Sequence, residues 1–119
     1  MAIFNSGNFM SVPDPLNFSQ EERVVGFWVD GRSVYQKTVV FEGRSIASSG
    51  VGTVIPEFGS DIKKLIHVFG TTSDGTYRDF SLIRGRLADG QISVYSQTSS
   101  STMADGWVTA WYIKEDLPE

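Results

Sequence analysis

The side chains that could carry out chemistry are few in this chain. His67 is the single histidine, and cysteine is absent, so neither a Cys–His pair nor a thiolate metal site can form. His67 lies between Ile66 and Val68 in an apolar run, a setting typical of an ordinary strand residue. One histidine alone predicts neither a catalytic triad nor a metal cluster.

The carboxylates offer little more. Asp30, Asp74, Asp89 and Asp105 each precede a glycine, so turn geometry accounts for them. No run of alternating acidic residues resembles a calcium loop. Two carboxylates distant in sequence could still meet as a glycosidase pair, which leaves a polysaccharide hydrolase as a minor hypothesis. We therefore expect a protein that is not an enzyme and that needs no cofactor or metal.

Binding chemistry is better represented, because aromatic residues make up 13% of the chain. Aromatic rings can stack on sugars or anchor a protein partner, although many belong to the core. The polar, Ser- and Thr-rich segment 97–104 either supplies hydrogen bonds to a ligand or is an ordinary loop. The candidate contacts for a glycan or a protein are Tyr95, Arg84, Arg86 and Trp107.

Composition narrows the class of protein. At 119 residues with 40% hydrophobic content, the chain predicts one domain with a substantial core. A formal charge of −4 and a pI near 4.9 argue against nucleic-acid binding, which depends on Lys and Arg. No stretch resembles a signal peptide or is long and apolar enough to span a membrane. We expect a soluble protein made in the cytoplasm.

Turn signals predict the fold. Four Asp-Gly pairs occur where composition alone predicts roughly one, and such pairs favour tight reversals between antiparallel strands. The strands expected outside the first hairpin cover residues 44–47, 51–55, 62–69, 77–87, 91–96 and 107–113. The sequence therefore predicts an all-β antiparallel β-sandwich or flattened barrel of about seven or eight strands.

The first predicted hairpin covers residues 24–41 and turns at Asp30-Gly31. A two-residue type I′ turn there pairs Val29 with Arg32, Phe27 with Val34 and Val25 with Gln36. In that register Val25, Phe27, Val29 and Val34 share one face, and Val24, Trp28, Tyr35 and Val39 share the other. With apolar residues on both faces, the hairpin should lie in a two-layer structure or against another subunit.

The second predicted hairpin covers residues 80–96 and turns at Asp89-Gly90. Its register pairs Leu87 with Ile92 and Gly85 with Val94. That register places Ile83, Leu87, Ile92 and Val94 on a buried face and Arg84, Arg86, Ser93 and Tyr95 on a polar face.

The chain divides into an extended N-terminal arm, residues 1–18, and a β-sandwich domain, residues 19–119. Pro13 and Pro15 disfavour helix in the arm. Three alternatives remain open: the arm packs on its own domain, it anchors on a neighbouring subunit, or it is disordered. Ser19 and Glu22 suggest a capping box and at most one helical turn before the first strand. The proposed anchoring residues are Phe4, Phe9, Met10, Leu16 and Phe18.

Residues 19–38 read S-Q-E-E-R-V-V-G-F-W-V-D-G-R-S-V-Y-Q-K-T. This stretch resembles a module recurrent in bacteriophage and prophage virion proteins, which often reads S-T-E-E-x-V-I-G-x-W-I-D-G-K-P-L-Y-x-K-T. Trp107 and the run 110–114 are similar to the closing aromatic strand of that module, whereas residues 42–90 match only in their pattern of strands. Ser33 replaces the proline that usually follows the turn.

The resemblance implies a small β domain on a virion appendage, such as a tail fibre, a head fibre or decoration on the capsid, or a baseplate accessory. Such proteins commonly form homotrimers and contact other virion proteins or host-surface glycans. Only 18 residues precede the module here, so we expect no long shaft. The favoured function is a structural accessory that is made in the host bacterial cytoplasm and docked in the virion by its arm. The alternative is a glycan-binding, receptor-binding module.

Overall fold

The computed structural model describes residues 18–47, 52–73, 80–96 and 103–118. These residues form seven strands and one short 3₁₀ helix, η1, with no α-helix among them. The expectation of an all-β antiparallel fold is confirmed, whereas residues 1–17 of the expected arm lie outside the described residues. The elements are β1 (Arg23–Phe27), β2 (Ser33–Ser45), β3 (Thr53–Val54), η1 (Pro56–Phe58), β4 (Lys64–Ser73), β5 (Phe80–Ala88), β6 (Gln91–Ser96) and β7 (Met103–Ile113).

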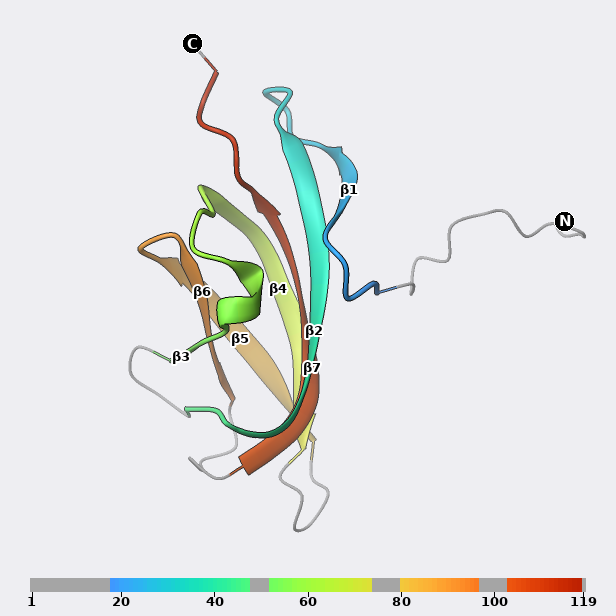
Figure 1. Cartoon of the computed structure of the whole chain (residues 1–119), viewed down its shortest axis with the longest axis vertical. Coiled ribbons are helices and arrows are strands. Elements are labelled where there is room, and N and C mark those ends of the chain that lie inside the picture. Colours follow the sequence, from blue (N-terminus) through green and yellow to red (C-terminus); the bar gives the residue numbers. More distant parts are fainter. Residues whose placement is uncertain (1–17, 48–51, 74–79, 97–102, 119) are drawn as a thin grey trace, which may run out of the picture.

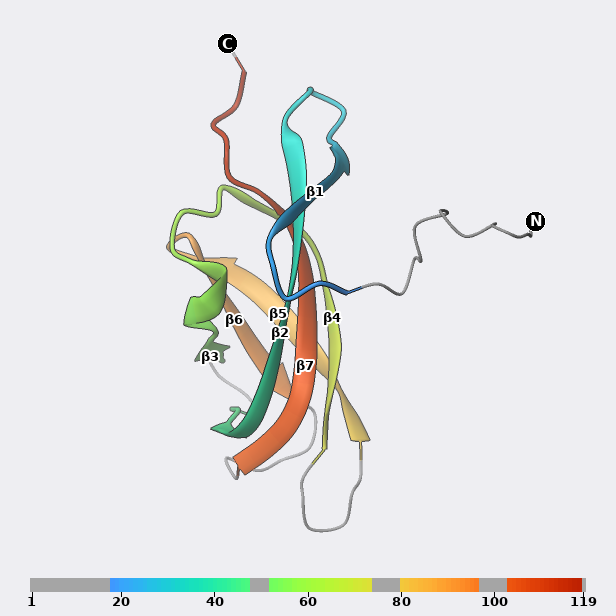
Figure 2. The same cartoon turned by 45° about the vertical axis from the view of Figure 1, so that its right-hand side comes forward.

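The strands form one sheet in the order β1-β2-β7-β4-β5-β6-β3, and every pair is antiparallel. The sheet curls into a half-barrel (Figures 1 and 2). Strand β5 makes the corner, because its first residues, 80–82, pair with the end of β4, and its remainder pairs with β6. β1 and β3 are the two edge strands.

The hydrophobic core fills the inside of the curl. Alternate residues of the two central strands point inward, including Val39 and Phe41 from β2 and Val108 and Tyr112 from β7, all at most 4% exposed. The other side of the core comes from Ile83, Ile92 and Val94. η1 contacts both β2 and β6 and buries Phe58, so this segment covers the open side of the half-barrel (Figure 1). Pro56 is the first residue of η1 and follows the short strand β3 after Ile55.

The second hairpin is confirmed in detail. Asp89 and Gly90 take φ values of 55° and 77°, the conformation of a type I′ turn. Leu87 pairs with Ile92 and Gly85 with Val94. Ile83, Ile92 and Val94 are buried and Arg84 and Arg86 are exposed. Ser93 is an exception to the predicted polar face, because it is buried beside Gly52 and pairs with β3.

The first hairpin forms, but its predicted register is wrong. Phe27 pairs with Ser33 and Gly26 with Val34, and a β-bulge follows between Val24 and Gly26. The turn contains three residues instead of two: Trp28 N–H donates to the Arg32 oxygen at 2.8 Å, and Gly31 alone has a positive φ, 93°. This is the geometry of a three-residue loop with a glycine bulge. One residue of slip reverses the faces, so Phe27 lies opposite Ser33 and not Val34. Beyond the bulge Val24 pairs with Tyr35, and these two residues share a face as predicted.

Two smaller expectations are also wrong. Asp105-Gly106 is no turn but part of β7. A Cβ on Gly106 would collide with the backbone oxygen of Thr71, so this glycine permits close approach of β4 and does not reverse the chain. Ser19 caps no helix; its hydroxyl accepts a hydrogen bond from Glu21 N–H at 3.0 Å in a bend before β1. The Asp74-Gly75 loop lies outside the described residues, and the expected strand 44–47 is the end of β2.

Candidate docking surface

The outer face of the sheet carries a continuous set of aromatic rings across β4 and β7. Register places His67 beside Trp111, Phe69 beside Thr109 and Thr71 beside Trp107. Phe69 meets Trp107 and Trp111 edge to face, at ring-centroid distances of 5.9 and 6.0 Å. The outer aromatic strip, as we call it, consists of Phe18, His67, Phe69, Trp107 and Trp111. These spacings are those of favourable aromatic pairs.

Phe18 joins the N-terminal segment to this strip. Its ring stacks on Trp107 at 5.4 Å and meets Phe69 edge to face at 5.5 Å. Thr38 N–H of β2 donates to the Ser19 oxygen at 2.9 Å. The place where the chain enters the folded domain is therefore fixed on the outer face. Of the predicted arm anchors, Phe18 is the one within the described residues.

An apolar groove adjoins the strip where β1 folds over the outer face. It encloses about 340 Å³. The Trp111 indole N–H donates to Gln36 Oε1 at 2.7 Å, which fixes one wall. Lys64 Nζ lies 5.3 Å from the centre of the Trp28 ring, a cation–π distance. The outer groove is lined by Val25, Gly26, Phe27, Trp28, Val34, Gln36, Ile66 and Trp111.

Strand β1 keeps large apolar side chains in solvent. Val25 is 49% exposed and Phe27 is 74% exposed, and Val29 in the following turn is 94% exposed. Edge strands usually avoid such exposure with charge, proline or bulges. β1 has a bulge at Val25, which discourages backbone pairing with another strand but leaves the side chains available. These exposed apolar side chains make the β1 edge a candidate site of association.

Polar contacts hold the first hairpin on the body. Arg32 forms an ion pair with Asp30 at 2.9 Å and donates to the Glu115 backbone oxygen at 3.2 Å. The Glu115 carboxylate accepts from Ser33 N–H at 3.0 Å and from the Tyr35 hydroxyl at 2.9 Å. The hydrogen bond to Glu115 raises the pKa of the Tyr35 hydroxyl. The residues after β7 therefore clamp the start of β2.

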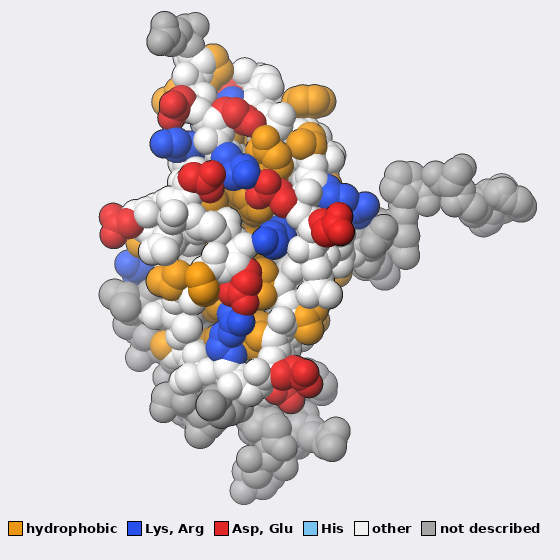
Figure 3. Space-filling model, in the orientation of Figure 1, with side chains coloured by type: hydrophobic (Ala, Val, Ile, Leu, Met, Phe, Trp, Pro, Cys, Tyr) orange, Lys and Arg blue, Asp and Glu red, His pale blue; other side chains and the backbone are white. Residues whose placement is uncertain are grey.

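A second clamp holds the segment before β1. Glu22 accepts from the buried Tyr112 hydroxyl at 2.6 Å and from Lys114 Nζ at 2.7 Å. Burial opposes ionisation of Glu22, but the hydrogen bonds from Lys114 and Tyr112 outweigh it and lower the pKa of this carboxyl. Burial, together with the bond to Glu22, raises the pKa of the Tyr112 hydroxyl. Figure 3 shows acidic and basic side chains interspersed with hydrophobic ones over the face that it presents.

The predicted glycan or protein contacts do not form one site. Arg84 and Tyr95 pair across β5 and β6, and the guanidinium lies 4.9 Å from the centre of the tyrosine ring. Arg86 is exposed on the same strand as Arg84. Trp107 is on β7, separated from β5 by β4 in the sheet order, and Phe18 covers one face of its ring.

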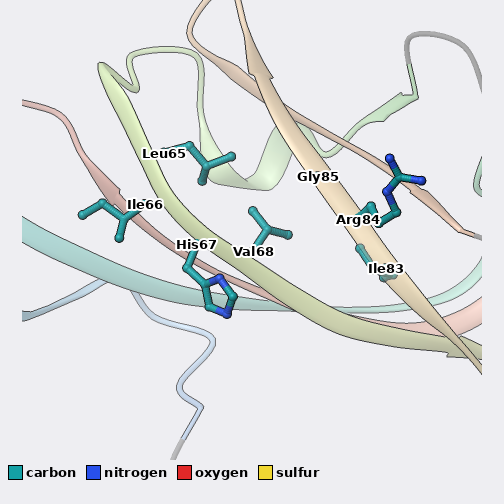
Figure 4. Close-up of a pocket in the computed structure, with 7 residues that line it drawn as sticks. All are labelled: Leu65, Ile66, His67, Val68, Ile83, Arg84 and Gly85. Atoms are coloured by element: carbon teal, nitrogen blue, oxygen red, sulfur yellow. The ribbon is translucent and has the colours of Figure 1, made fainter.

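A second hollow, of about 420 Å³, opens where β4 and β5 diverge (Figure 4). Leu65 and Val68 point towards β5, and Gly85 lies directly against Val68. His67 and Arg84 are the ionisable side chains of its lining, which contains no carboxylate. His67 is a strand residue of β4, as expected, and this hollow presents no acid–base pair.

Sequence reasoning missed the outer groove. Its walls come from four strands: β1 with its turn, the start of β2, β4 at the bulged residue Ile66, and β7 at Trp111. The alternation of Trp107, Thr109 and Trp111 was a usable signal, since it indicates one outward-facing row. The missing information was that Phe69 and His67 lie in the neighbouring strand on the same face.

Comparison with protein-family models, with curated proteins and with solved structures found no match to this chain. Within the described residues, no helix has the length and hydropathy needed to cross a membrane. Likewise, His, Cys, Asp and Glu side chains of the described ranges form no group of three or more that could hold a metal ion.

Proposed function

We propose that this protein is a non-enzymatic structural accessory of a bacteriophage virion. In this proposal it is a compact surface component of the head or tail that docks on other virion proteins and is oligomeric, with a trimer favoured. The observation that carries the proposal is the apolar outer face, where β1 exposes Val25 and Phe27 beside the outer groove. A protein that works alone in water has no evident use for this surface.

Two further features support the proposal. The stretch that resembles the virion module, residues 19–38, includes β1, its turn and half of β2, so the resemblance falls on the same edge that exposes the apolar surface. Phe18 also brings the N-terminal segment to that face. An apolar segment next to an apolar surface is what we expect of a virion component that binds neighbouring proteins.

Particle incorporation tests the function. The full chain and a chain lacking residues 2–17 are expressed during particle production, and purified particles are probed for each. We expect the full chain in the particles, and we expect the shortened chain to remain folded in solution but to be absent from particles. If the full chain never co-purifies with particles, the virion assignment is wrong. If the shortened chain is incorporated normally, the arm is not the anchor.

One observation favours a second function, attachment to a host-surface glycan. Arg84 over Tyr95 presents a planar cation and a ring on the outer side of the second hairpin, a combination suited to stacking and hydrogen bonding with a sugar. A glycan array tests it with the oligomeric protein and the variant Tyr95→Ala. Hits that disappear in the variant support this function, whereas an array without hits argues against it.

A further inference from the structure

The edge of β2 limits where the N-terminal segment can go. β7 pairs with β2 from Tyr35 to Ser45 on one side. On the other side β1 reaches only to Gln36, and the Ser19 oxygen then accepts the N–H of Thr38. In the described part of the chain no strand pairs with β2 beyond Thr38 on that side. The segment before Ser19 therefore begins beside an available strand edge.

Proline prevents the segment from using that edge. In an antiparallel ladder, residues two apart present their backbone groups to the same neighbour. Because Ser19 faces β2, positions 17, 15 and 13 would face it as well. Pro15 and Pro13 have no N–H to donate to a ladder. Strand pairing with the same chain's β2 therefore cannot continue past Asn17.

The same prolines make a stiff section in the sequence between Phe18 and the apolar residues Phe9 and Met10. Each residue before a proline is held extended, so residues 12–16 span roughly 12 Å at about 3.1 Å per residue. Trp111, in the groove wall, lies no farther from Phe18 than that, because Phe69 lies 5.5 Å from Phe18 and 6.0 Å from Trp111. In the sequence Leu16 ends this stiff section near Phe18, whereas Phe9 and Met10 precede it.

We propose that the outer groove binds the N-terminal segment, residues 3–12, of a second copy of this chain. The segment fits the groove in character: residues 1–17 contain one ionisable side chain, Asp14, and several large apolar ones. The groove is lined mainly by apolar side chains. This inference rests on the proposed function, because it takes the arm to be a docking element, and it names the partner.

Exchange of arms determines the form of the assembly. The arm and the groove are different surfaces, so each contact is heterologous. Such contacts close into a ring or a reciprocal pair where the geometry closes, and otherwise continue as an open chain of subunits. Burial of apolar side chains stabilises the contact by about 25 cal/mol per Å². The chains each carry a charge of −4, so added salt screens their repulsion and strengthens the assembly.

Light scattering on the purified full chain tests the proposal. We expect an oligomer, a monomer when residues 2–17 are deleted, and a monomer for Val25→Glu, which puts a charge into the groove. Val29→Glu is the matched control: the same substitution four residues away, on a side chain that is 94% exposed and outside the groove lining. We expect it to remain oligomeric. Phe9→Asp in the arm provides a second disrupting variant should Val25→Glu fail to fold.

Mixing separates arm exchange from other modes of association. Chains lacking residues 2–17 keep the groove, and Val25→Glu chains keep the arm, so the mixture should form a one-to-one complex that neither forms alone. A monomeric full chain, an oligomer that survives arm deletion, or a mixture without complex would overturn the proposal. A monomer that still enters particles contradicts this inference and the proposed oligomeric state but not the virion function, and an oligomer absent from particles contradicts only the virion function.

Discussion

The two Asp-Gly hairpins have similar turn sequences and different structures. At Asp89-Gly90 both residues have positive φ and the strands pair directly across the turn. At Asp30-Gly31 only Gly31 has a positive φ, and the loop contains three residues instead of two. The difference lies in the surroundings: Arg32 and Glu115 hold the first turn by side chains, whereas the second is held by the packing of Ile92 and Val94 in the core.

This difference corresponds to different roles. The second hairpin has one buried and one largely polar face, so its register follows from hydrophobic burial. The first hairpin lies at the sheet edge with apolar side chains in solvent, so burial within the monomer does not specify its register. A hairpin fixed by polar clamps, with its apolar side chains left exposed, is suited to contact a partner. The following predictions test this contrast, from the largest effect to the smallest.

Substitution of the two turn glycines by alanine should give the largest difference in stability loss between the two hairpins. A Cβ on Gly90, at φ 77°, would collide with the Ser60 backbone oxygen, whereas a Cβ on Gly31, at φ 93°, meets nothing within 4 Å. We expect Gly31→Ala to lower the free energy of unfolding by about 1–2 kcal/mol, from backbone strain alone. Gly90→Ala should lower it by about 3 kcal/mol or more. Urea denaturation measures both.

Gly26→Ala is the control for these variants, because that site has open space and no positive φ. It should change stability by less than about 0.5 kcal/mol. Equal losses for Gly31→Ala and Gly90→Ala would remove the distinction between a packed turn and an open one.

Loss of the Glu115 clamp should weaken the first hairpin selectively. Glu115→Ala removes the acceptor of Ser33 N–H and of the Tyr35 hydroxyl. We expect a loss of about 1–2 kcal/mol, with faster amide hydrogen exchange in β1 and the start of β2 and no change at Ile92 or Val94. Asp116→Ala is the control, since its ion pair with Lys63 is exposed and worth under about 1 kcal/mol. Uniform acceleration in both hairpins would contradict the clamp.

Acid should affect the first hairpin through Glu22, with a smaller effect. The folded state lowers the pKa of this carboxyl from its usual value of 4.5, so Glu22 contributes stability above that value. As the pH falls below 4.5, the unfolded chain takes up the proton first, and the contribution is lost through the folded-state pKa. Thermal melts at stepped pH should show a shallower acid slope for Glu22→Gln than for the wild type. Glu42→Gln, at an exposed position, should leave the slope unchanged.

The sequence predicted the second hairpin and the all-β class because alternation and turn chemistry are local signals. It failed where tertiary contacts decided the outcome. The loop at Asp30 depends on Glu115, 80 residues or more from the groups it binds, and the role of Gly106 depends on the approach of β4. The predicted contact residues do not form one site because the sequence does not give the order of the strands. Trp107 and Tyr95 look equivalent in sequence but lie on strands separated in the sheet. Phe18 was proposed as an anchor of the arm, and the structure places its ring against Trp107 and Phe69 of its own chain.

The central claim is that the chain associates through β1 and the outer groove and not through the second hairpin. Hydroxyl-radical labelling of the purified full chain, compared with the chain lacking residues 2–17, tests it most directly. We predict that labelling of Phe27 and Trp111 is lower in the full chain, because the arm of a second copy covers them, while labelling of Tyr95 is the same in both. Equal labelling of Phe27 and Trp111 in the two proteins, with Tyr95 protected in the full chain, would contradict the claim.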